Sequence, residues 1–215
     1  MNKPQFTYPI FDALGKNLFH GTYSHAPSHS SIVYALQEHG DQIEIIESIP
    51  MSPPRCDALI TQKQGLFLAI KHADCQAAIF HDPVTQTSAA VHAGWRGLVQ
   101  NIYQKTIQAM RKNYSVLPEN LIVAIGPSLG PKNSQFLHYE SEFPEPFWAY
   151  QESPFYFNLR SIARDQLLAE GILKENICIE ETDTFSDMRC YSYRRDKTSQ
   201  RMVTLMGRTE APTDR

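Results

Sequence analysis

Residues 69–97 read AIKHADCQAAIFHDPVTQTSAAVHAGWRG, and this stretch decides the expected fold. Two short apolar runs, QAAIF and TSAAVHAG, lie on either side of Asp82-Pro83, a dipeptide that favours turns. Runs of this length, bounded by turn residues, are typical of strands. We therefore expect a β-hairpin here, with a helix beginning directly after it near Gly97.

The hairpin brings a cysteine and a histidine together. With the loop centred between Pro83 and Val84, Cys75 lies directly opposite His92. Directly opposed side chains have Cβ atoms about 4.5–5.5 Å apart, so a thiol and an imidazole can share a metal ion or act as nucleophile and base. In the structural alternative, Cys75 is a small buried residue and His92 is a hydrogen-bonded core histidine.

The residues that follow His92 favour ligand binding. Gly94 and Gly97 let the backbone approach a bound molecule, and the free N–H groups at a helix start attract an anion. Arg96 adds a permanent, forked charge that suits phosphate.

Further elements extend on both sides of the hairpin. Apolar residues recur at helical spacing from Val99 to Met110, and a second helix is expected over 158–171, with Asn158 as N-cap and Gly171 at the C-terminal end. Other strands are expected in QIEIIESI, ALIT, GLFLAI, LIVAIGP, ICIEE, CYSYR and MVTLM. Residues 1–32 are expected to be irregular and residues 208–215 to form a loose tail. The whole indicates one α+β domain over 1–215, with mixed β-sheets packed with helices.

Composition restricts the class of protein. The 215 residues are 42% hydrophobic and carry a net charge of -3, so no global field attracts nucleic acid or an anionic membrane. The start of the chain has no apolar run typical of a signal peptide, and no stretch approaches about 18 apolar residues. We expect a cytoplasmic location with reduced cysteines, of which three are expected to be structural: Cys56, Cys178 and Cys190.

Several motifs carry a family resemblance. HADC, an apolar strand and then AVHAGWRG closely resemble the laccase-domain family, also called the multicopper polyphenol oxidase family, whose members look like metal-dependent purine nucleoside phosphorylases. LQEHGDQI, CDALIT, AIGPSLGP and CYSYRRD resemble further segments in the same order. The resemblance covers roughly residues 33–207 and implies a layered α/β sandwich, similar to a bacterial toxin deamidase.

The resemblance also implies a metal site. It assigns zinc to His39, Cys75 and His92, with copper possible in vitro, and leaves a coordination position open for water or substrate. Spacing alone does not choose the third ligand. The reserve candidates for it are His20, His25 and His29.

The implied activity is phosphorolysis of adenosine, inosine and S-methyl-5'-thioadenosine, with adenosine deamination as a second activity. The expected partners are purine nucleosides and phosphate. Arg96, Arg194 and Tyr193 are candidates for contacts to phosphate or nucleoside, and Asp74 for a catalytic role. Alternatively, Arg194 ends an exposed strand, Tyr193 belongs to the core and Asp74 caps a backbone turn.

Two departures from the family pattern affect these expectations. The N-terminal part is shorter than in the family, and residues 132–135 read KNSQ where Cys-Cys-Tyr-Glu is expected. Three other functions remain open: copper-dependent phenol oxidation, a metal-free Cys–His hydrolase or deamidase, and a binding module that uses zinc to stay folded. The eight histidines include no His-x-His pair, which argues against a laccase-type copper centre.

Overall fold

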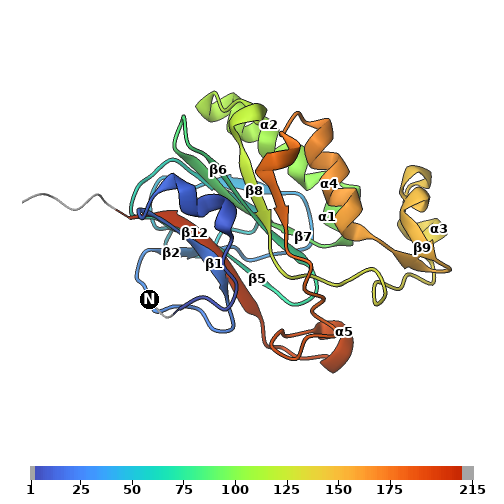
Figure 1. The fold of residues 1–215 in the computed structure, drawn as a ribbon. Coiled ribbons are helices and arrows are strands. Elements are labelled where there is room, and N and C mark those ends of the chain that lie inside the picture. Colours follow the sequence, from blue (N-terminus) through green and yellow to red (C-terminus); the bar gives the residue numbers. More distant parts are fainter. Residues whose placement is uncertain (1–2, 210–215) are drawn as a thin grey trace, which may run out of the picture.

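The computed structural model describes residues 3–209, which form two mixed β-sheets and a layer of helices (Figure 1). The smaller sheet consists, in spatial order, of β1 (Leu18–Tyr23), β12 (Met202–Arg208), β5 (Phe67–His72) and β2 (Ile32–Tyr34). The larger consists of β11 (Ile177–Ile179), β8 (Ile122–Ile125), β6 (Gln76–Asp82), β7 (Thr87–Ala93), β4 (Ala58–Thr61) and β3 (Ile43–Ile45). Each sheet combines parallel and antiparallel pairs.

Helices cover one face of the larger sheet. The main ones are α1 (Trp95–Val99), α2 (Ile102–Tyr114) and α4 (Leu159–Ala169). Short helices complete the chain: α3 (Tyr139–Glu142), α5 (Tyr193–Asp196), and the 3-10 helices η1 (Pro9–Leu14), η2 (Pro118–Asn120), η3 (Glu145–Tyr150) and η4 (Lys174–Asn176). None of the described helices is both long and apolar enough to cross a membrane.

The larger sheet is buried on both faces. Along β6, Ala78 and Phe80 pack against the helices, whereas Ala77 and Ile79 belong to the core shared with the smaller sheet. Side chains alternate along a strand, so the fully apolar run QAAIF is explained by burial on both sides. The expected α+β fold of mixed sheets packed with helices is confirmed.

The hairpin forms, but its predicted register is wrong. Asp82 pairs with Thr87, and His92 lies opposite Ala77 rather than opposite Cys75. Cys75 is the residue immediately before β6. The two-residue offset keeps Cys75 and His92 on the same face, because the side-chain period of a strand is two.

The loop itself explains the offset. Its centre lies one residue later than expected, because residues 83–86 form the connection. The Asp82 carboxylate accepts hydrogen bonds from the Val84 N–H and the Thr85 hydroxyl, both at 2.8 Å. Gln86 then takes a left-handed conformation with φ 60°, which returns the chain to β7.

The helix predictions are confirmed for one helix and corrected for the other. In α4, Asn158 accepts from the Ser161 N–H at 3.0 Å, and Gly171 has φ 91° just beyond the end. The expected single helix after Gly97 is two helices, because Asn101 has φ 61° and interrupts the helical backbone between α1 and α2.

Three further expectations need correction. CYSYR is not a strand: Ser192 accepts from the Arg195 N–H at 3.1 Å and begins the short helix α5. The N-terminal residues 1–32 are not wholly irregular, since β1 pairs with β12 along its whole length. Arg208 is the last residue of β12 rather than part of a loose tail, and residues 210–215 lie outside the described part.

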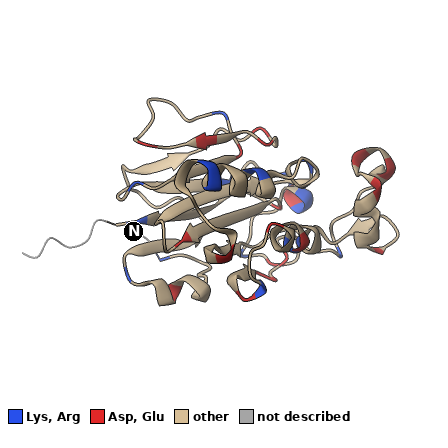
Figure 2. Cartoon of the chain, turned by 90° about the horizontal axis from the view of Figure 1, so that it is seen from above, with Lys and Arg blue, Asp and Glu red and all other residues tan. Residues whose placement is uncertain are grey.

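An arm, defined here as residues 135–157, projects from the side of the molecule (Figure 1). It contains α3, η3 and the hairpin of β9 (Gln151–Ser153) and β10 (Tyr156–Phe157). Phe136, Phe143 and Phe157 form its small core, against which Trp95 packs. Several acidic positions, red in Figure 2, lie in its outer part. The helix α3 carries Glu140 and Glu142.

Candidate metal centre

Three potential ligands meet where β6 begins and β7 ends. Donor atoms of His39, Cys75 and His92 all lie within 4.8 Å of one another. A tetrahedral zinc ion, with bonds of about 2.0–2.3 Å, needs donors roughly 3.5 Å apart. His39 is exposed, so a small rotation of its ring can close the difference. The donor set of two imidazoles and one thiolate therefore fits a zinc or copper ion.

A buried carboxylate orients His92. Asp57, just before β4, is 1% exposed, and its Oδ1 lies 2.7 Å from Nδ1 of His92. When Nδ1 of His92 carries the proton, its N–H donates to this carboxylate. Nε2 of the neutral ring is then unprotonated and free to bind a metal. A carboxylate behind a ligating histidine is the usual support of metal sites in proteins.

The same carboxylate holds the loop that carries His39. Asp57 accepts backbone N–H groups from Glu38 at 3.2 Å, His39 at 3.1 Å and Gly40 at 2.8 Å. His39 has φ 59°, a left-handed conformation that is uncommon outside glycine. The hydrogen bonds to Asp57 stabilise that conformation, so one side chain fixes two of the three ligands.

Electrostatics favour the metal-binding state of the cysteine. Burial opposes ionisation of Cys75, but the adjacent His92 and His39 outweigh it and lower the pKa of the thiol to about 6. Burial also opposes the charge on His92, but Cys75 and Asp57 raise its pKa to about 9. The thiolate is the form that binds metal.

Gly94 provides the space in which the ligands meet. A Cβ at this position would lie 3.2 Å from the Cys75 sulfur and 3.4 Å from Cδ2 of His39. The Gly94 backbone, with φ -74° and ψ 176°, is accessible to any residue. The requirement for glycine is therefore steric.

Gly94→Ala is expected to weaken zinc binding by about 10- to 100-fold, since overpacking costs about 1–3 kcal/mol. Competition with a chromophoric chelator measures the affinity. Gly40→Ala is the matched control, because its Cβ would make only an ordinary 3.6 Å contact with Asp57. Equal affinities of the two variants would contradict the steric argument.

The three potential ligands line a cavity of about 980 Å³. Its wall also carries four cationic side chains, and within residues 3–209 none of them forms an ion pair with a carboxylate. They are Lys71, Arg96, Arg194 and Arg201. The facing carboxylates are those of Asp74 and Glu142. With four cationic side chains against two carboxylates, the cavity has an excess of positive charge and attracts anions.

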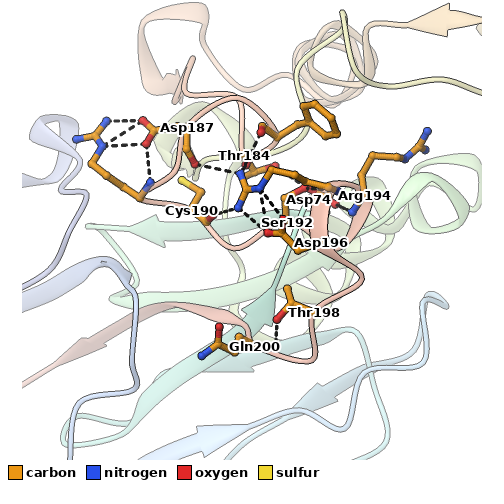
Figure 3. A network of polar contacts seen from close by, with 12 residues as sticks. Asp74, Thr184, Asp187, Cys190, Ser192, Arg194, Asp196, Thr198 and Gln200 are labelled. Atoms are coloured by element: carbon orange, nitrogen blue, oxygen red, sulfur yellow. Dashed lines mark hydrogen bonds and ion pairs between the residues drawn. The ribbon is translucent and has the colours of Figure 1, made fainter.

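Asp74 supports the backbone around α5 (Figure 3). Its carboxylate accepts from the Thr184 hydroxyl at 2.7 Å and from the Arg194 N–H, in the first turn of α5, at 2.6 Å. Asp74 itself has φ 79°. The capping alternative thus has direct contacts in its favour, while a catalytic role for Asp74 stays a prediction.

The adjacent arginines are held differently. Both terminal nitrogens of Arg194 donate to the Gln135 carbonyl at 3.1 Å, and its side chain lines the cavity. Arg195 does not line the cavity; its guanidinium donates to the carbonyls of Thr184, Phe185 and Cys190. A contact of Arg194 with a ligand stays a prediction, whereas Arg195 holds the loop before α5 together.

The unusual segment 132–135 leads to the cavity wall, which its last residue, Gln135, lines. Asn133 donates to Asp183 at 2.6 Å, and the same carboxylate accepts from the Gly130 N–H at 2.9 Å. The Gln135 carbonyl is the acceptor for Arg194. The Asn133 side chain and the Gln135 carbonyl thus help to shape the loop between β8 and the arm.

The other predicted site residues lie around the rim. Tyr193 and Arg96 are exposed and line the cavity, and Arg96 stacks over Trp95 at 4.2 Å. The reserve ligands lie elsewhere among the described residues: the metal-binding group does not include His20, His25 or His29. Sequence reasoning missed Asp57, although a carboxylate at the start of the buried run ALIT requires a partner.

The fold and the site define an α+β protein of two packed mixed sheets, with a His-Cys-His cluster able to bind a metal in a basic cavity. The family model described as multi-copper polyphenol oxidoreductase laccase matches residues 17–209, and the chain belongs to this family.

Named relatives and solved structures agree with this assignment. The chain is 30% identical over 183 residues to a purine nucleoside phosphorylase of Xylella fastidiosa (strain Temecula1), covering 79% of this chain and 69% of the relative. It is 27% identical over 189 residues to purine nucleoside phosphorylase YfiH of Escherichia coli K12, covering 82% and 74%. The crystal structure of YlmD from Geobacillus stearothermophilus matches with a TM-score of 0.76 at 28% identity, covering 84% of this chain and 74% of that one.

Proposed function

We propose that this protein is a zinc-dependent purine nucleoside phosphorylase acting on adenosine, inosine and S-methyl-5'-thioadenosine, with adenosine deamination as a second activity. The observation that carries the proposal is the His39–Cys75–His92 cluster within a cavity lined by four cations that form no ion pair with a carboxylate among residues 3–209. The names of the relatives supply the reaction class. A bound zinc would supply a Lewis acid that polarises a ligand atom or acidifies water.

The chain's own residues have a clear division of tasks in this reaction. In phosphorolysis a phosphate oxygen bonds to C1' of the ribose, the glycosidic C–N bond breaks, and its electron pair leaves with the base, which takes up a proton. Arg96 and Arg194 hold the phosphate dianion, since a forked guanidinium pairs well with phosphate oxygens. Asp57 keeps His92 and the His39 loop in place.

The decisive test combines zinc-loaded protein, inosine and phosphate. Release of hypoxanthine that depends on phosphate, with formation of ribose 1-phosphate, supports phosphorolysis. Base release without phosphate would indicate a hydrolase instead. Absence of both base release and adenosine deamination would exclude the proposed function.

Arg194→Ala is expected to lower kcat/KM for phosphate by about 10- to 100-fold, the equivalent of one hydrogen bond to a charged group. Initial rates at varied phosphate measure the effect. Arg195→Ala is the matched control, because that side chain serves the loop and not the cavity. Arg195→Ala is expected to lower the melting temperature and to leave the KM for phosphate unchanged. A raised KM for phosphate in Arg195→Ala, with an unchanged KM in Arg194→Ala, would refute the assignment of phosphate binding to Arg194.

A metal-free hydrolase is a second candidate, favoured by one geometric observation. Cys75, His92 and Asp57 form a nucleophile, a base and an orienting carboxylate in the order that cysteine hydrolases require. The rate at which iodoacetamide alkylates Cys75 distinguishes the zinc enzyme from the metal-free hydrolase. Zinc protects Cys75 from iodoacetamide if it is a ligand, whereas a free nucleophile reacts at the same rate with or without a chelator.

A further inference from the structure

A second, smaller cavity adjoins the metal cavity. This side cavity has a volume of about 320 Å³ and shares two lining residues with the larger one, Lys71 and Arg201. The rest of its wall consists of hydroxyl, amide, imidazole and small apolar groups, and within residues 3–209 no carboxylate lines it. Two cations beside neutral hydrogen-bonding groups make a site that favours an anion.

The strand register brings the two cations together. Lys71 of β5 lies opposite Val203 of β12. Arg201 precedes Val203 by two residues, which is the spacing of side chains on one face of a strand. Diagonal neighbours of this kind on adjacent strands lie about 7–8 Å apart. Both side chains line the side cavity, so one small anion can contact both.

Backbone carbonyls hold the guanidinium of Arg201 in place. Its Nη1 donates to the carbonyls of Thr198 and Gln200, both at 2.8 Å. The Thr198 hydroxyl accepts the Gln200 N–H at 3.0 Å and supports the turn that presents these carbonyls (Figure 3). Within residues 3–209 no carboxylate pairs with Arg201, so its charge is not neutralised by the protein.

One edge of this guanidinium is accessible to a ligand. Among the described residues, the hydrogen bonds of the Arg201 side chain involve Nη1 and neither Nε nor Nη2. The side chain is half-buried, yet neither nitrogen is among the buried polar atoms that lack a partner. Both therefore reach solvent. Nε–H and Nη2–H together form the fork that binds two oxygens of a phosphate.

We propose that Lys71 and Arg201 form a phosphate-binding subsite in the side cavity, which neither Arg96 nor Arg194 lines. The fork of Arg201 holds two oxygens of a phosphate dianion, and the Lys71 ammonium pairs with a third. Free phosphate and the 5'-phosphate of a nucleotide share this chemistry, the nucleoside part of a nucleotide lying in the metal cavity. The nucleotide source rests on the proposed function, whereas the subsite itself does not.

Titration of zinc-loaded protein with inorganic phosphate, without nucleoside, tests the subsite. The ¹⁵N–H resonance of Arg201 Nε, assigned by its loss in Arg201→Gln, gives a Kd for this site alone. Phosphate is expected to shift it in a saturable manner, and a resonance that phosphate leaves unchanged would overturn the inference. No base is released in this experiment, so its failure is distinguishable from failure of the proposed function.

Lys71→Gln removes the second charge and leaves the backbone contacts intact, because Lys71 is hydrogen-bonded to Gln37 only through its N–H and carbonyl. It is expected to raise the Kd for phosphate, measured at Arg201 Nε, by about 2- to 5-fold. Lys112→Gln is the matched control, since Lys112 is exposed in the last turn of α2 and lines neither cavity. Equal effects of the two substitutions would show a response to net charge alone and would overturn the inference.

Inosine 5'-monophosphate and inosine distinguish the two sources of phosphate by calorimetry. If the nucleotide is the ligand, it binds about 10-fold or more tightly than inosine, as for hydrogen bonds to a charged group, and Arg201→Gln abolishes the difference. If free phosphate is the ligand, the nucleotide binds no more tightly than inosine, and Arg201→Gln weakens only the binding of inorganic phosphate.

Arg201→Gln also removes the hydrogen bonds to Thr198 and Gln200, so thermal melting accompanies each titration. A folded Arg201→Gln protein with unchanged affinity for both phosphate and the nucleotide would overturn the subsite. If this variant does not fold, Lys71→Gln provides the same comparison of nucleotide, nucleoside and phosphate, and unchanged affinities there would overturn the subsite equally.

Discussion

Cys75→Ala is expected to lose stoichiometric zinc and, with it, all phosphorolysis of inosine. The thiolate is the only anionic donor among the three clustered ligands. The free energy of zinc binding in structural sites is about 10–16 kcal/mol, or about 3 kcal/mol for each of four ligands. Removal of the Cys75 thiolate should therefore weaken zinc binding by roughly 100-fold or more. Mass spectrometric metal analysis after dialysis, beside release of hypoxanthine, measures both effects.

Cys178→Ala is the control for this experiment. Cys178 is half-buried in β11, is paired with Ala124 in the register and does not belong to the metal-binding group. It should retain one zinc per chain and full turnover. A Cys75→Ala protein with undiminished zinc would refute the metal centre; one without zinc but with undiminished turnover would refute the need for metal in catalysis.

Local patterns were sufficient to predict the strands and helices that the core requires. The runs ALIT, QAAIF and TSAAVHAG become β4, β6 and β7 because apolar residues of this length, bounded by turn residues, are buried most easily as strands. The helix α4 was predicted to within a residue or two, since Asn158 and Gly171 mark its ends.

Conformations set by distant contacts could not be predicted in this way. The run CYSYR alternates like a strand, yet the Asp74 carboxylate, about 120 residues away in the chain, accepts the Arg194 N–H and supports a helix there. The register of the hairpin depended on the hydrogen bonds of Asp82 inside a four-residue loop. Neither interaction leaves a periodic signal in the sequence.

The site shows the same distinction. Cys75 and His92 are close in sequence and share a hairpin, so pairing them needed only a local argument. His39 lies on an exposed loop and reaches the site through the carboxylate of Asp57, and only the family resemblance identified it. The basic cavity combines Lys71, Arg194 and Arg201 from separate parts of the chain, which only the folded arrangement brings together.

Asp57→Asn is expected to reduce zinc affinity by about 10- to 100-fold, the usual effect of removing the support behind a ligating histidine. An asparagine has one acceptor oxygen, whereas Asp57 accepts from His92 Nδ1 and from three backbone N–H groups, including those of His39 and Gly40. The amide nitrogen would face some of these donors. At least one would lose its partner, at a cost of about 1–3 kcal/mol in the free energy of unfolding.

Asp82→Asn separates the local effect from general destabilisation. Asp82 is equally buried and also accepts from a backbone N–H and a side chain, but at the loop end of the same hairpin. Both variants should unfold at lower urea concentrations, whereas only Asp57→Asn should bind zinc more weakly in chelator competition. If the two lowered zinc affinity equally, Asp57 would act through stability alone. Asp57 positions both histidines of the metal site. Its substitution should therefore lower the zinc affinity more than Asp82→Asn does, at a similar loss in the free energy of unfolding.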